Sequence, residues 1–186
     1  MRSTLQRSAI GNCRSRLSRR KRHARSYSKP CSTRPFRTEH RPYLTARKSV
    51  FSKIVGEPHA GGFELRFARF LDDASDVAAF GKNYLAVGFK IDYVRADRDL
   101  STYTPDFVVR TTDDTVWITE TKGREELDLP QKMTRLRQWC DDATKASKAE
   151  GGPTYRFVYV DQKGFEQNTP ETFASLAASF TEYQET

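Results

Sequence analysis

The spacing of apolar residues changes along the chain from three and four positions to two positions, and each spacing predicts a kind of element. Apolar residues from Leu65 to Phe80 recur at helical spacing, which predicts a helix that is broken near residues 72–75 and ends at Gly81. A second stretch, residues 130–150, has the same spacing and is followed by Gly-Gly-Pro at 151–153. We therefore expect two amphipathic helices in these regions.

Alternating or short apolar runs bounded by turn residues predict four strands, at residues 84–94, 103–110, 115–122 and 154–161. Residues 171–183 form a last helix in this interpretation, capped by Thr169 ahead of Pro170. The order helix, three strands, helix, strand, helix predicts an α/β fold with a small mixed sheet of about four strands and helices on both faces.

Charge divides the chain into two parts. The 186 residues carry a net charge of +8, yet residues 1–50 hold 15 Lys and Arg against one acid, which leaves a balance of −6 for residues 51–186. We therefore predict a basic, Arg- and Ser-rich tail at 1–50, too poor in apolar residues to fold, and one domain at 51–186. The tail suits contact with nucleic acid phosphates, an organelle presequence, simple solvation, or a start codon assigned upstream of the true domain.

Several classes of site and location are not supported by the composition. The three cysteines have neither CxxC spacing nor partners for zinc, so we expect a reducing compartment and a buried, unreactive Cys140. The chain lacks GxxxxGK[ST] and GxGxxG, so no ATP site of either kind is expected. No apolar run approaches the roughly 20 residues that a membrane-spanning helix needs, so no membrane partner is expected.

Two acids lie where a hairpin brings like charges together, within "TYTPDFVVRTTDDTVWITETKG" at 102–123. A three-residue loop at 112–114 places Asp106 opposite Glu120, and alternation puts Lys122 on the face of Glu120. A divalent cation removes the repulsion between the acids. Mg²⁺ suits two carboxylates and a backbone carbonyl, here that of Thr121, and Lys122 then lies beside the reacting water or phosphate.

A purely structural interpretation of the same residues stays open. Pro-Asp is a common turn dipeptide, and Glu-x-Lys at a strand end is often a solvated edge. A loop of two or four residues also shifts the register by one and separates Asp106 from Glu120.

The residues "PDF" at 105–107 and "ETK" at 120–122 resemble the signature of the PD-(D/E)XK nucleases. The longer run from "FELRFARFLDD" through "ETKGREELDLPQKMTRLRQWCDDA" resembles the C-terminal endonuclease domain of the restriction subunit of type III restriction enzymes, and the similarity covers about residues 50–186. This resemblance implies a restriction-endonuclease-like fold, a bacterial cytoplasmic location and Mg²⁺-dependent hydrolysis of double-stranded DNA, with Mn²⁺ as a substitute metal.

The resemblance also implies residue roles. Asp106 and Glu120 hold the metal, Lys122 orients or activates the water, and Glu64 matches an additional acid found in many members. Gln131 and Lys132 open the following helix and are candidates for DNA contact, although a solvated helix start explains them nearly as well. A helicase-like ATPase and a modification methyltransferase are the partners that a type III system implies. This sequence has no phosphate-binding loop, so we expect a separated nuclease domain, a gene fragment or a small stand-alone relative. The competing hypothesis is a non-catalytic DNA-binding or assembly module that retains the nuclease fold.

Overall fold

The computed structural model describes residues 42–56, 62–84, 87–122 and 128–183, so most of the predicted basic tail, residues 1–41, lies outside the described residues. The elements are β1 (Tyr43–Leu44), β2 (Ile54–Val55), α2 (Phe63–Asp73), β3 (Val77–Lys82), β4 (Ile91–Val94), β5 (Leu100–Tyr103), β6 (Phe107–Thr111), β7 (Thr115–Lys122), α3 (Leu129–Ala149), β8 (Thr154–Asp161), α4 (Gln162–Asn168) and α5 (Phe173–Ser179).

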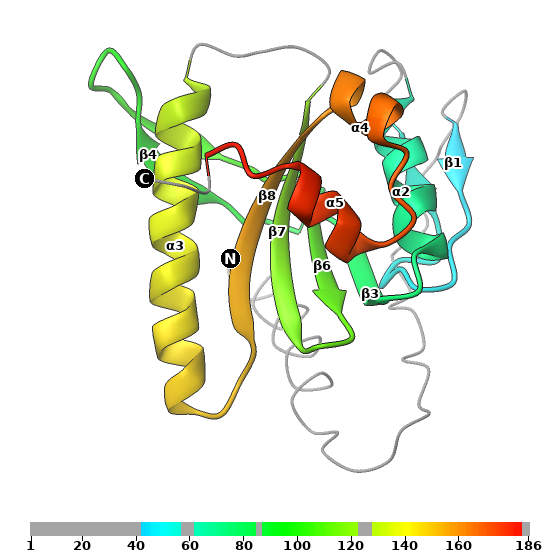
Figure 1. The fold of residues 1–186 in the computed structure, drawn as a ribbon. Helices are drawn as coiled ribbons and strands as arrows, with labels where there is room; N and C mark the ends of the chain where they lie inside the picture. The colour runs from blue at the N-terminus through cyan, green and yellow to red at the C-terminus, as the bar shows by residue number, and fades with distance from the viewer. Residues whose placement is uncertain (1–41, 57–61, 85–86, 123–127, 184–186) are drawn as a thin grey trace, which may run out of the picture.

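A mixed sheet of four strands in the order β3-β6-β7-β8 forms the centre of the fold (Figure 1). The β3–β6 and β6–β7 pairs are antiparallel, whereas β7 and β8 are parallel and α3 connects them. Parallel neighbours need such a crossover, and a helix is its usual form. The predicted α/β class and the mixed four-stranded sheet are therefore confirmed.

Each face of the sheet carries its own apolar core. On one face, α2 and α5 pack on odd-numbered positions of β6 and β7, with Phe67, Phe107, Trp117 and Phe173 in one cluster. On the other face, α3 and the β4–β5 hairpin pack on Ile118 and its neighbours. The side chains alternate between the faces as strand geometry requires, so helices lie on both faces as predicted.

The strand β3 corrects the prediction that the first helix continues to Gly81. The helix α2 ends at Asp73, and residues 77–82 pair with β6. A β-bulge between Val77 and Ala79 shifts the register, so Val77 and Phe80 both face the core although they lie three residues apart. Apolar residues with a spacing of three then resemble a helical pattern, which explains the error.

The predicted strands at 84–94 and 103–110 are also corrected. Among the described residues of the first, which exclude 85 and 86, only Ile91–Val94 form a strand, and it pairs with β5 in a separate two-stranded sheet. Gly88 has a left-handed φ of 75°, outside the range of extended strands. The second strand is interrupted between Tyr103 and Phe107, at the corner that contains Pro105. The strand β5 begins at Leu100, three residues before the predicted start of the second strand.

The C-terminal region differs from its prediction as well. The helix predicted at 171–183 is shorter in the structure, where α5 spans Phe173–Ser179, and the short helix α4 (Gln162–Asn168) was not predicted. Thr172, not Thr169, caps α5 through its side chain, while Thr169 takes a left-handed φ of 39° at the end of α4. The strands at 115–122 and 154–161 and the helix at 130–150, which α3 matches to within one residue, are confirmed, and Cys140 is buried as expected.

Residues 42–50, which the sequence analysis assigned to the tail, pack against the domain. The hairpin β1–β2 lies beside α2 (Figure 1), and Ala46 belongs to the core on that face. Ser49 pairs with Phe80 of β3 in a parallel bridge, and the carboxylate of Asp72 accepts hydrogen bonds from the N–H groups of Arg47 and Lys48. We call residues 42–56 the N-terminal strap.

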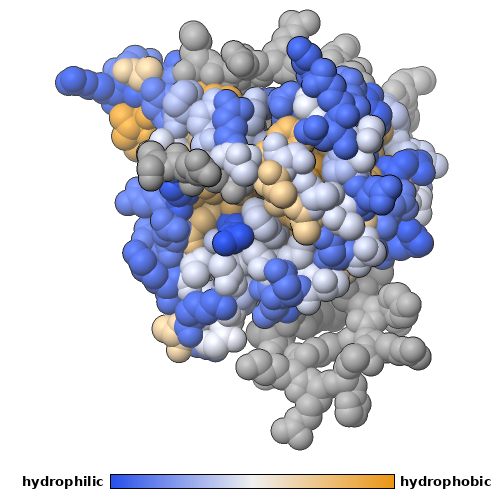
Figure 2. Space-filling model, in the orientation of Figure 1, coloured by the Kyte–Doolittle hydropathy of each residue, from blue (hydrophilic) through white to orange (hydrophobic). Residues whose placement is uncertain are grey.

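Polar residues cover most of the face shown in Figure 2, with small apolar patches that include one at the upper left, where the β4–β5 hairpin lies in Figure 1. Val94 and Leu100 are cross-strand partners there, and both side chains are exposed. Among the described helices, none is long and apolar enough to cross a membrane.

Candidate active site

The corner that leads into β6 positions Asp106 at one end of the sheet. The N–H of Asn83 donates to the carbonyl of Asp106 at 2.7 Å, and the Asn83 amide donates to the carbonyls of Pro105 and Phe89 at 2.8 and 2.9 Å. Asn83 follows directly after β3, so the end of β3 fastens this corner. The sequence analysis did not single out Asn83.

The hairpin β6–β7 has the register that the sequence predicted. Phe107 pairs with Thr119 and Val108 with Ile118, and the turn at 112–114 has the expected three residues. One step further in this register, Asp106 lies opposite Glu120. The Asp106 Oδ2 atom accepts hydrogen bonds from the backbone N–H of Thr121 at 2.8 Å and from its hydroxyl at 2.6 Å.

Glu120 is almost completely buried, with 1% of its surface exposed. The hydroxyl of Tyr103 donates to Glu120 Oε2 at 2.8 Å, and the ammonium of Lys122 lies 2.8 Å from Oε1. Tyr103 comes from the separate β4–β5 sheet, so two sheets meet at this carboxylate. Tyr103 is a site residue that the sequence analysis missed, because its strand was predicted to be continuous with β6.

Burial sets the protonation of both acids. Loss of solvation and then the negative charge of Asp106 raise the pKa of Glu120 to about 8, against the lowering effects of Lys122 and Tyr103. Burial also raises the pKa of Asp106, although the two hydrogen bonds from Thr121 lower it, and the charge of Glu64 raises it further. Two acids with raised pKa values thus lie at the same end of β6 and β7, and such a pair marks a candidate functional site.

Glu64 joins the same cluster from the other side of the sheet. It lies in the first turn of α2, where a negative charge also favours the helix dipole. Its Oε2 atom accepts a hydrogen bond from Lys82 at the end of β3. The structure thus brings together the four residues predicted to be catalytic, Glu64, Asp106, Glu120 and Lys122.

The predicted DNA-contacting residues, Gln131 and Lys132, lie in the first turns of α3. Lys132 places its ammonium 5.7 Å from the ring centre of Tyr93 and 5.8 Å from that of Tyr103, which links it to the tyrosine that holds Glu120. The donors of Thr121 bind Asp106, and the use of its carbonyl as a metal ligand stays a prediction.

The donor set fits a hard divalent cation. No described residue donates to Asp106 Oδ1, and two neighbouring carboxylates with raised pKa values gain from a cation that removes their repulsion. Among the described side chains, no three from Asp, Glu, His and Cys enclose a metal-sized position by themselves. A cation bound here would need water molecules as further ligands, as Mg²⁺ commonly has.

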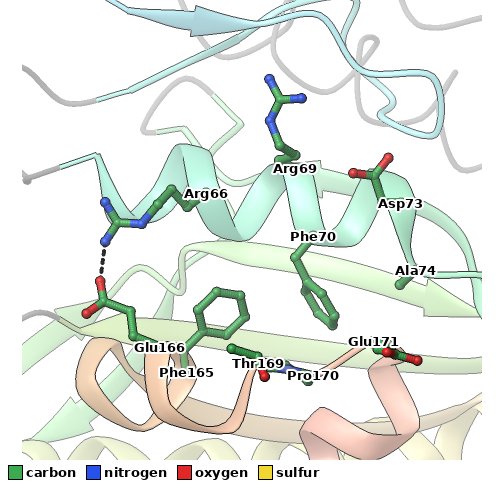
Figure 3. Close-up of a pocket in the computed structure, with 10 residues that line it drawn as sticks. All are labelled: Arg66, Arg69, Phe70, Asp73, Ala74, Phe165, Glu166, Thr169, Pro170 and Glu171. Atoms are coloured by element: carbon green, nitrogen blue, oxygen red, sulfur yellow. Dashed lines mark hydrogen bonds and ion pairs between the residues drawn. The ribbon is translucent and has the colours of Figure 1, made fainter.

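A pocket between α2 and α4 lies apart from this cluster (Figure 3). The rings of Phe70 and Phe165 meet edge to face at 5.5 Å across it, and an ion pair of 2.6 Å between Arg66 and Glu166 spans one end. The pocket contains none of the acids of the site. Its contacts join α2 to α4 and offer no paired acids of the kind found at the sheet edge.

Comparison with models of protein families, with curated proteins and with solved structures finds no match of any of the three kinds. The function of this chain is therefore inferred from the geometry of the site and from the resemblance of its motifs.

Proposed function

We propose that the chain is a Mg²⁺-dependent DNA endonuclease of the PD-(D/E)XK type, related to the nuclease domain of type III restriction subunits. One observation carries this proposal. Asp106 and the buried Glu120 lie opposite each other at the same end of the central strands β6 and β7, and the Lys122 ammonium lies 2.8 Å from Glu120. A solvated strand edge, the structural alternative, does not account for an almost fully buried Glu120 with a raised pKa.

In this proposal each residue of the cluster has a defined role in hydrolysis. Asp106 and Glu120 hold the cation, which supplies positive charge at the attacked phosphate and acidity to a water molecule. Lys122 orients that water or holds a phosphate oxygen. Thr121 aligns Asp106, and Tyr103 fixes the second oxygen of Glu120. Water forms a new bond to phosphorus, the phosphorus bond to a deoxyribose oxygen breaks, and that oxygen receives a proton.

We propose double-stranded DNA as the substrate, and the positive charge of residues 1–50 supports this proposal. The balance of −6 over residues 51–186 disfavours DNA, whereas residues 1–50 carry a balance of +14. We infer that the basic segment holds the DNA backbone while the domain cuts. Deletion of residues 1–41 is expected to weaken DNA binding and to flatten its dependence on salt. A helicase-like ATPase and a methyltransferase are the partners that this proposal implies, in a bacterial cytoplasm.

Cleavage of supercoiled plasmid by the full chain tests the proposal, with Mg²⁺, with Mn²⁺ and with a chelator. Lys122→Met is expected to lose about 100-fold or more in rate, as removal of one preorganised electrostatic group typically does. Asp106→Asn keeps an acceptor for Thr121 and is also expected to be inactive. Lys145→Met changes an exposed lysine on α3 and is the matched control.

A different result supports the competing function. If the wild-type chain binds DNA but does not cleave it, and if neither metal raises its melting temperature, the cluster is not a metal site. The chain is then a non-catalytic DNA-binding or assembly module.

A further inference from the structure

Lys82 is a buried lysine that neither the sequence motifs nor the proposed mechanism uses. It is the last residue of β3 and pairs with Phe107, the residue directly after Asp106. Only 6% of its side chain is exposed. Lysines are rarely buried to this extent unless a partner compensates the charge. The contacts of the Lys82 ammonium therefore indicate its role.

The ammonium group of Lys82 has three partners in a closed environment. It donates to Glu64 Oε2 and to the carbonyl of Val55 at 3.3 Å, and it lies 5.3 Å from the ring centre of Tyr84. Tyr84 is itself fixed, because its hydroxyl accepts the N–H of Val55 at 2.7 Å. The N-terminal strap, through Val55, and the end of β3 thus hold the ammonium against Glu64.

Two of the three acids, Glu64 and Glu120, each form an ion pair with a lysine. Lys82 binds Glu64 and Lys122 binds Glu120, whereas the hydrogen bonds that the Asp106 carboxylate accepts from other described residues come from the neutral donors of Thr121. Glu64 lies close enough for its charge to act on Asp106. Without Lys82, a third carboxylate stands unpaired beside two others, and repulsion drives it away from them.

We propose that Lys82 is a positioning residue that holds the Glu64 carboxylate beside Asp106, where the negative charge of Glu64 raises the affinity of the site for a divalent cation. This inference rests on the proposed function. It assigns Lys82 no contact with DNA or with the cation, because the ammonium is enclosed by Glu64, Val55 and Tyr84.

A double-mutant cycle on the full chain tests the inference, with Mn²⁺ affinity measured by calorimetry. The variants are Glu64→Gln, Lys82→Met and the double variant, with Lys53→Met as an exposed lysine control from the same strap. Glu64→Gln is expected to weaken Mn²⁺ binding about 10-fold in the wild-type background and less than about 2-fold in the Lys82→Met background. Thermal unfolding of each variant monitors folding separately.

The interaction between the two substitutions distinguishes positioning from simpler roles. A lysine that acts only through its charge changes Mn²⁺ affinity overall but leaves the Glu64→Gln factor the same, and a merely structural lysine changes only the melting temperature. If Lys82→Met does not fold, Lys82→Gln replaces it as a neutral variant that keeps a hydrogen-bond donor. Lys82→Arg keeps the cation and is expected to restore the full Glu64→Gln factor.

Each outcome decides between the two proposals. An equal Glu64→Gln factor in both backgrounds overturns the role of Lys82 and leaves the nuclease proposal standing. Mn²⁺ binding that Glu64→Gln does not weaken also overturns it, because the charge of Glu64 then does not act on the metal site. A wild-type chain that does not bind Mn²⁺ overturns the metal site, and the role of Lys82 with it.

Discussion

Replacement of Glu120 by glutamine tests the electrostatics of the site without DNA. Glutamine has the same shape and still accepts the Tyr103 hydroxyl, but it cannot ionise. The pKa of Glu120 is about 8 in the folded protein against a normal value of 4.5. A raised carboxyl pKa means that the folded state binds the proton more tightly than the unfolded chain, so stability falls as the pH rises between these two values.

The size of the effect follows from the same two pKa values. In metal-free buffer, ionisation of Glu120 in the unfolded chain lowers the wild-type free energy of unfolding by about 1 kcal/mol at about pH 5 and by about 3 kcal/mol at about pH 7. The loss levels off above about pH 8. Glu120→Gln lacks this effect, so its stability relative to the wild type is expected to increase by about 2 kcal/mol from about pH 5 to about pH 7.

Urea unfolding of both proteins at several pH values between about 5 and 8.5, with a chelator present, measures this difference. Glu166→Gln removes an exposed carboxylate and is expected to follow the wild-type curve. Parallel curves for Glu120→Gln and the wild type would refute the buried, proton-binding state of Glu120. Repetition with Mg²⁺ is expected to flatten the wild-type curve, because a bound cation favours the ionised carboxylate.

Three further substitutions test other parts of the structure, each by urea unfolding. Tyr103→Phe removes the hydroxyl that donates to Glu120 and is expected to lower the free energy of unfolding by about 1 to 2 kcal/mol. An unchanged free energy of unfolding contradicts this hydrogen bond. Met133→Ala truncates a fully buried side chain of α3 and is expected to cost about 2 to 5 kcal/mol; a change below about 1 kcal/mol contradicts the packing of α3 on the sheet. Asp76→Ala removes the carboxylate that accepts the N–H groups of Phe173 and Ala174, and is expected to cost about 1 kcal/mol and to loosen α5; unchanged stability contradicts this capping role.

The sequence was sufficient to predict the register of the hairpin that carries the two acids. The polar turn at 112–114 fixed the loop length, and loop length determines which residues face each other. The strand β7, the helix α3 and the strand β8 were predictable for a related reason, since each is long, regular and bounded by turn residues.

The sequence was insufficient where long-range contacts decide the local structure. The β-bulge in β3 gave a strand the spacing of a helix, and this concealed Lys82 at its end. Tyr103 and Asn83 reach the site only because a second small sheet and the corner at Pro105 bring them there. Neither contact has a local sequence signal, so the supporting residues around the acids could be found only from the structure.

Because Tyr103 lies on a separate hairpin, any motion of that hairpin would act on the protonation of Glu120. Within the described part of the chain, β4 and β5 pair only with each other, and two-stranded ribbons open more easily than central strands. Separation of this hairpin from the sheet removes the tyrosine from Glu120 and admits water to the carboxylate. Water favours the ionised form, so any opening of the hairpin would be linked to loss of the proton from Glu120, and alkaline conditions would then favour the open state.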